Sequence, residues 1–230
     1  MTEGANMPKS TVFQRQMRTL CAAGLLCVGL VATAGDAKPP QYTEDGLELS
    51  KAKGVGLLYL RPGASLASYT KVMIDPVQVA FSKSWNPRDY GTYGLKASDV
   101  ERIRTELGAL AHDTFVKVLQ EGGYPSATEA DEGVLRVTAY IIDLYITAPD
   151  TMQAGRSRTY VANAGQMMLV MELRDAVTGT LLARAADRKA ASDTGRLQWS
   201  SSVFNRAEAE RILEGWGKRL KQGLDAAEGR

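Results

Sequence analysis

The sequence predicts an α+β domain in which two helices pack on a single mostly antiparallel sheet. Residues 98–121 and 205–224 place apolar side chains at helical spacing, so each segment has one continuous apolar stripe. The other apolar segments are short or alternate with polar residues, as strands do. The order along the chain is strands, helix, strand, hairpin and helix, which is typical of an α+β fold.

The first strands precede the first helix. Residues 54–60 are expected to form a strand that ends at Arg61-Pro62-Gly63, where proline lacks a donor and glycine permits a turn. Residues 69–73 and 77–81 are also expected to be extended, with Asp75-Pro76 between them. Because proline cannot donate to a ladder, this strand is expected to lie at a sheet edge or to kink there.

The first helix has the clearest sequence signals. Ser98 and Glu101 are spaced as a capping box, which predicts the start of the helix. Gly122-Gly123 is expected to end it. The predicted buried stripe consists of Val100, Ile103, Leu107, Leu110, Ala111, Val118 and Leu119.

The second half of the chain adds a long strand, a hairpin and a helix. Residues 134–146 carry apolar side chains on both faces, which predicts a central strand partly covered on each side. Residues 167–186 alternate on either side of a turn at residues 175–179, which predicts a β-hairpin. The last helix is expected to open at Asn205, with Glu208 three residues later. No internal repeat is visible, so residues 42–230 are expected to form a single domain.

The N-terminus reads as a secretory signal peptide over residues 1–34. A basic beginning precedes the apolar run 20–31, and Ala32-Thr33-Ala34 provides the small-x-small pattern that signal peptidase accepts before Gly35. The apolar run is shorter than the ~20 residues of a membrane-spanning helix, so no transmembrane anchor is expected after cleavage. Residues 35–41 are expected to form a short tether.

A lipoprotein signal is the alternative to a cleaved leader. It needs a small residue before a cysteine at the end of the apolar run, but Cys21 and Cys27 each follow leucine inside the run. Lipid anchoring is therefore less favoured than a free periplasmic or secreted protein.

Composition excludes several classes of function for the exported chain. Both cysteines lie in the leader, so the remainder has no disulfide, thiol nucleophile or thiolate metal site. The leader also holds three basic residues, Lys9, Arg15 and Arg18, against Glu3, and the chain as a whole has 28 basic and 26 acidic residues. Once the leader is removed, acidic and basic residues are equal in number, and the chain lacks the basic excess that nucleic-acid binding requires.

No pattern in the sequence predicts catalysis. His112 is the only histidine and lies off the apolar stripe of its helix, so it is expected to be solvated. No phosphate-binding or dinucleotide-binding fingerprint occurs, and neither a metal nor a cofactor is expected. Glu172, Asp187 and Asp193 could serve a glycosidase only if two of them faced one cleft, and solvated charges are favoured. The chain is therefore expected not to be an enzyme.

A binding surface is predicted between Arg61 and Tyr93. This segment places Arg61, Tyr69, Asp75, Trp85 and Tyr90 in largely irregular backbone, a composition typical of binding surfaces. The alternative is structural: the aromatic residues would cap the core, and Arg61 and Asp75 would form an ion pair.

A family resemblance agrees with export. The segment Tyr42-x-x-Asp45-Gly46-Leu47, followed by Arg61-Pro62-Gly63 and by residues 69–77, resembles a family of bacterial envelope proteins of unknown function, most of them regarded as lipoproteins. The resemblance covers most of the chain from Tyr42 and implies a Gram-negative envelope location, with no established activity. The missing lipobox departs from the family pattern.

Three functions are consistent with these observations. The leading hypothesis is a non-catalytic envelope protein that binds a protein or glycan partner. The second is an envelope hydrolase with a carboxylate or serine centre. The third is a structural subunit of an envelope assembly, with residues 167–171 as an adhesive strand. The oligomeric state is left open.

Overall fold

The computed structural model describes residues 38–89, 94–146, 160–161, 165–190, 198–199 and 202–230. The chain divides into two compact units, Met1–Pro39 and Pro40–Arg230, and the described helices and strands all belong to the second unit. The predicted signal peptide, residues 35–37 of the predicted tether and the candidate residue Tyr90 lie outside the described residues.

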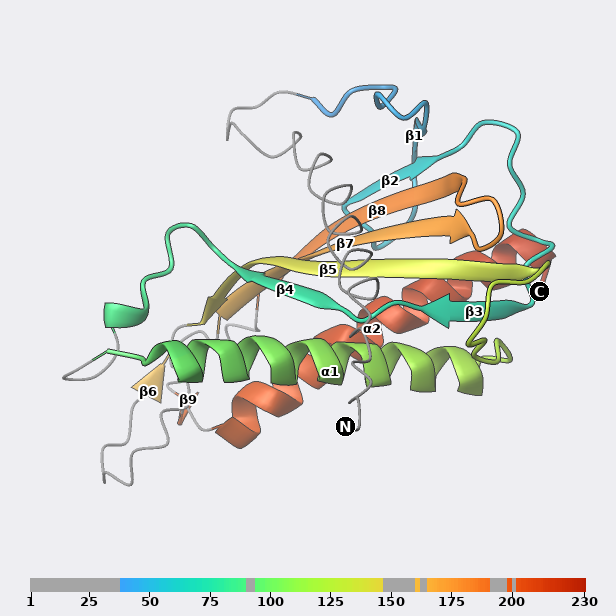
Figure 1. Ribbon diagram of the computed structural model, residues 1–230. Helices are drawn as coiled ribbons and strands as arrows, with labels where there is room; N and C mark the ends of the chain where they lie inside the picture. Colours follow the sequence, from blue (N-terminus) through green and yellow to red (C-terminus); the bar gives the residue numbers. More distant parts are fainter. Residues whose placement is uncertain (1–37, 90–93, 147–159, 162–164, 191–197, 200–201) are drawn as a thin grey trace, which may run out of the picture. The chain divides into compact units, whose positions relative to one another are not determined.

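The second unit is built on a seven-stranded sheet with two long helices on one of its faces (Figure 1). The strands are β1 (Glu48–Ser50), β2 (Leu57–Leu60), β3 (Lys71–Ile74), β4 (Gln78–Phe81), β5 (Val134–Ile146), β7 (Gly165–Asp175) and β8 (Leu181–Ala190). The helices are α1 (Ala97–Glu121) and α2 (Ser202–Glu228), and a 3-10 turn, η1, spans Pro87–Asp89. A second, two-stranded sheet pairs β6 (Tyr160–Val161) with β9 (Gln198–Trp199).

The strand order β1-β2-β8-β7-β5-β3 is antiparallel except at β5, where β3 and β4 both pair in parallel. β3 pairs with the first part of β5, and β4 pairs with the part from Tyr140 to Leu144. Asp75-Pro76 lies between β3 and β4, because proline has no N–H to donate to the ladder. The predicted α+β class and the central position of residues 134–146 are confirmed.

Both predicted helices are present, but their starts were predicted too late. α1 begins at Ala97, so Ser98 lies within its first turn and does not cap it. Instead, Lys96 is the N-cap, and its backbone N–H donates to Asp99 Oδ2 at 3.2 Å. α2 begins at Ser202, three residues before Asn205. The predicted end of α1 is confirmed, and Gly123 adopts a φ of +92°.

The main hydrophobic core lies between the sheet and the two helices. Alternate β5 residues point to this side, and the helices contribute Phe115 and Leu119 from α1 and Leu213 and Trp216 from α2. The opposite face of the sheet has a smaller buried cluster of Leu47, Tyr59 and Leu181. Most of the apolar burial is therefore on the helix side. Among the described residues, no helix is long and apolar enough to cross a membrane.

Candidate functional site

Two of the predicted binding residues are buried aromatic side chains. Tyr69 is 8% exposed, and its hydroxyl donates to Asp175 Oδ2 at 2.9 Å. Burial is the main cause that raises the pKa of Tyr69 to about 12, and the hydrogen bond to Asp175 adds to it. Trp85 stacks on Phe81 with ring centroids 4.0 Å apart, and its Nε1 donates to the carbonyl oxygen of Ile146 at 3.1 Å. Both side chains thus help to close the core.

The two charged candidates are held by different groups. Asp75 accepts from Arg136 Nε at 2.9 Å and from Thr138 Oγ1 at 2.6 Å. Arg61 donates from Nε to the carbonyl oxygen of Leu181 at 2.5 Å. The alternative in which Arg61 pairs with Asp75 is therefore wrong, because each side chain has other partners.

The four described candidates do not share one surface. Arg61 follows β2, whereas Asp75 and Trp85 follow β3 and β4, and β8, β7 and β5 lie between these strands in the sheet. Tyr69 lies beside the turn between β7 and β8 through its bond to Asp175. A role in binding remains a prediction for these residues, and Tyr90 lies outside the described part of the chain.

An apolar pocket lies between the β2–β8 side of the sheet and α2, and we refer to it as the α2 pocket. Its volume is about 440 Å³, within the roughly 300–1,000 Å³ that small-molecule sites occupy. Its walls are mainly aliphatic and include Leu58, Leu60, Leu169, Leu182, Leu220 and Leu224.

Small residues create the space for this pocket. Leu58 and Leu60 point to the helix side of β2, where α2 presents Gly223 and Ala227. On β8 the lining residues include Ala183 and Ala185, whose short side chains fill little of the gap. A Cβ at position 223 would have no heavy atom within 4 Å, so the backbone of α2 borders open space there.

The acidic group of the pocket, Asp187, has several bonding partners. Its Oδ1 accepts from Gly56 N at 3.1 Å, and its Oδ2 accepts from Trp216 Nε1 at 2.8 Å. Lys189 Nζ lies 3.0 Å from Oδ2. Asp187 is 7% exposed, so these bonds compensate for the burial of its charge. This carboxylate is committed to the fold and is not available as a general base.

The pocket also has two basic side chains, Arg219 and Arg61, and both donate to backbone carbonyl oxygens. Arg219 Nη1 donates to the carbonyl oxygen of Gly215 at 3.1 Å. Besides its bond to Leu181, Arg61 donates from Nη2 to the carbonyl oxygen of Asp45 at 3.3 Å. Within the described residues, neither guanidinium forms an ion pair. The pocket therefore combines apolar walls with unneutralised positive charge.

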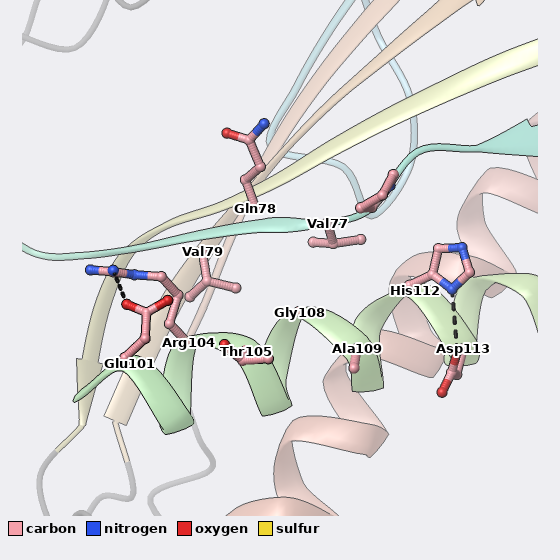
Figure 2. A pocket seen from close by; sticks show the side chains of 11 residues that line it. Val77, Gln78, Val79, Glu101, Arg104, Thr105, Gly108, Ala109, His112 and Asp113 are labelled. Atoms are coloured by element: carbon pink, nitrogen blue, oxygen red, sulfur yellow. Dashed lines mark hydrogen bonds and ion pairs between the residues drawn. The ribbon is translucent and has the colours of Figure 1, made fainter. Parts of the chain in front are cut away.

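A second, more open groove of about 690 Å³ runs between β4 and α1 (Figure 2). Its charged side chains pair locally, with Arg104 Nη1 2.6 Å from Glu101 Oε2 and His112 Nδ1 3.2 Å from Asp113 Oδ1. His112 thus lies at the helix surface beside one exposed carboxylate. Because these polar groups pair along α1 and do not converge, the α2 pocket is the better candidate.

The carboxylates considered for catalysis do not meet. Glu172 accepts from Arg174 and Arg184 at 2.8 and 2.7 Å. Glu172 pairs with Arg184 across the ladder and Asp187 with Leu169, which places Glu172 and Asp187 on opposite faces of the sheet. Asp193 lies outside the described residues, and no group of three or more His, Cys, Asp or Glu residues that could hold a metal occurs in the described part.

The family of the chain follows from its sequence over most of its length. Residues 41–220 match the family described as "Protein of unknown function (DUF3313)". The chain belongs to this family. This match confirms one part of the predicted resemblance, namely that the chain contains a domain of unknown function. The match does not single out the residues on which the resemblance was based. The comparison with curated proteins gave no match to this DUF3313 chain.

Several solved structures are similar to this DUF3313 chain at low identity. The PelC dodecamer from Paraburkholderia phytofirmans is 12% identical, with 71% of this chain and 96% of that chain covered and a TM-score of 0.37. Protein XCC0632 from Xanthomonas campestris is 12% identical, covering 73% and 93%, with a TM-score of 0.36. A minor lipoprotein from Acinetobacter baumannii is 10% identical, covering 67% and 94%, with a TM-score of 0.28. Likenesses this distant carry no functional argument.

The α2 pocket was not predicted from the sequence. Of its two basic residues, Arg219 lies on the last helix, far along the chain from the predicted segment at residues 61–93 that contains Arg61. One signal was present: along the apolar stripe of α2, the large residues Leu220 and Leu224 alternate with the small residues Gly223 and Ala227, a change in side-chain size within one stripe. Such a change at helical spacing indicates space beside a helix.

Proposed function

We propose that the protein is an exported, non-catalytic binding protein of the bacterial envelope whose ligand inserts an apolar group into the α2 pocket. The pocket carries the proposal, because an aliphatic cavity of about 440 Å³ gains free energy when an apolar group replaces water in it. Export is supported by the leader at residues 1–34.

The lining favours an apolar ligand over a glycan. A sugar presents many hydroxyl groups, and most of them would lose their hydrogen bonds to water against leucine and alanine side chains. The lining also offers little to a hydrolase. Ser65 Oγ accepts from Ala67 N at 3.2 Å, Asp187 is committed to Gly56 and Trp216, and the lining contains no histidine.

The environment of residues 167–171 does not support the alternative of a structural subunit. Residues 167–171 belong to β7, which pairs with β5 on one side and with β8 on the other. Its backbone therefore has no free edge with which to add a strand from another chain. Met167, Leu169 and Met171 are buried against the helices.

Replacement of Gly223 tests the pocket directly. We expect an environment-sensitive apolar fluorophore to bind the purified protein with a gain in emission, and the variant G223F to lose that binding because its ring fills the open space beside α2. G223A is the control, since it also removes the glycine but leaves most of the cavity free. Equal dye affinity in G223F, G223A and the unaltered protein would show that the pocket is not the binding site.

The envelope location has its own test. After expression in a Gram-negative host, we expect the protein in the periplasmic fraction, with Gly35 as its first residue by intact-mass measurement. Recovery from the cytoplasm with an intact leader, or from the membrane with a lipid-modified cysteine, would contradict this location.

A further inference from the structure

We propose that the ligand of the α2 pocket is a single-chain amphiphile with an anionic head group, and that Arg219 binds this head. The inference rests on the proposed function, because it names the chemical class of ligand for the same pocket. The distribution of charge around the lining and the direction in which the pocket extends both support it.

Arg219 differs from the arginines of the sheet in its surroundings. Arg184 forms ion pairs with Asp45 and Glu172 at 2.7 Å each, and Arg136 forms one with Asp75 at 2.9 Å. Arg219 has only the carbonyl oxygen of Gly215 as a hydrogen-bond partner among the described residues. A guanidinium group carries five N–H donors, so most of its donors are available to a ligand.

The end of the pocket beside Arg219 is positively charged. A Cβ at Gly54 would lie 2.9 Å from Arg219 Nε, so the guanidinium group lies against the segment that precedes β2. In that segment Ala52 lines the pocket, and the exposed residues Lys51 and Lys53 flank it. The one lining carboxylate, Asp187, is offset by Lys189 at 3.0 Å. The net positive charge is complementary to an anion.

The other end of the pocket lies near the opposite end of β2. Arg61 follows β2, whereas Gly54 precedes it, so the two lining arginines are separated by the length of the strand. Arg61 uses Nε and Nη2 on the carbonyl oxygens of Leu181 and Asp45 and is thus held by the backbone. An alkyl chain that starts at Arg219 would run between β2 and α2, along leucine side chains.

This arrangement accounts for both kinds of lining group. The chain of the amphiphile would cover the aliphatic walls, and each methylene moved out of water would strengthen binding about fourfold. The head would accept charge-assisted hydrogen bonds from Arg219, which a neutral head of the same size would not receive at equal strength. The affinity therefore depends on chain length and on head-group charge separately.

The test is a competition experiment that uses an apolar fluorophore and three ligands of equal chain length: dodecanoate, dodecanol and dodecyltrimethylammonium, all below their micelle-forming concentrations. We expect dodecanoate to compete best. We expect R219Q to weaken dodecanoate by about ten- to a hundredfold and to leave dodecanol within about twofold. R219K, which keeps the charge, should retain most of the affinity.

K218Q is the control for the general charge of α2. Lys218 lies next to Arg219 in sequence, is exposed and pairs with Glu214 at 3.0 Å, and it does not line the pocket. We expect no change in K218Q. Equal competition by dodecanoate and dodecanol, together with unchanged affinities in R219Q, would overturn the anionic head while the apolar pocket stands. If none of the three ligands competes and G223F still binds the dye, the proposed function itself fails.

Discussion

Tyr69 links the segment before β3 to the turn between β7 and β8. Its ring belongs to the main core, and its hydroxyl bonds to Asp175 at 2.9 Å. Asp175 also accepts from the backbone N–H of Val177 and Thr178, and these bonds, that of Thr178 foremost, lower its pKa. One phenol thus joins the core to a turn that is far away in sequence.

Replacement of Tyr69 by phenylalanine measures this link. We expect Y69F to lower the free energy of unfolding by about 1–3 kcal/mol, because a bond to a charged acceptor is lost while the ring stays buried. Urea unfolding with an unchanged m-value checks the result. A free energy equal to that of the unaltered protein would mean that the bond contributes nothing. Y69A would also create a cavity, so it cannot separate a binding role from a structural one.

The same residue predicts a loss of stability at alkaline pH. The pKa of Tyr69 is about 12 in the folded protein and about 10 in an unfolded chain. The folded state favours the protonated phenol, so this contribution is complete below about pH 10 and is lost as the pH rises towards 12. We expect the absorbance titration of phenolate in Y69F to lack one late-titrating group. An unchanged late phase would contradict the assignment.

At the scale of elements, Gly108 of α1 and Gly223 of α2 serve different purposes. Gly108 lies where α1 meets β4, and a Cβ there would be 2.7 Å from the carbonyl oxygen of Val77. Gly223 faces open space at the α2 pocket. The first glycine allows close packing, and the second leaves room.

This difference predicts opposite effects for one substitution. We expect G108A to destabilise the protein by about 1–3 kcal/mol, because backbone atoms must move apart. G223A should stabilise it by about 0.5–1 kcal/mol, because alanine restricts the unfolded chain and fits the helix. Thermal unfolding of the two variants side by side checks both signs. A gain in stability for G108A would mean that α1 can move away from β4 at little cost.

Across the whole molecule, the sequence predicted the elements whose signals are local. The stripe of α1, the apolar residues on both faces of β5 and the turn at residues 175–179 each lie within one segment, and the structure has all three. The N-cap of α1 was predicted two residues late, at Ser98 and not at Lys96, because the hydrogen bond at the start of the helix is donated by Lys96 N to Asp99. β1 was not predicted, since three residues carry too little periodicity.

The candidate site was less accessible to prediction, because it depends on segments that are distant in sequence. The α2 pocket joins residues 52–66 to β7, β8 and α2, and no short motif marks that meeting. The predicted surface at residues 61–93 contributed only Arg61 to it among the named candidates. Aromatic composition suggested binding at Tyr69 and Trp85, where burial instead made them part of the core.

The parallel pairing of β3 and β4 with β5 bears on the order in which the molecule folds. The β7–β8 hairpin closes over a short turn and brings together residues close in sequence. β3 and β4 can pair with β5 only after the chain has passed through the whole of α1, so the entropy of a long loop must be overcome first. The hairpin is therefore expected to form early, and the β4 edge, with the groove beside it, to be among the last parts of the sheet to assemble.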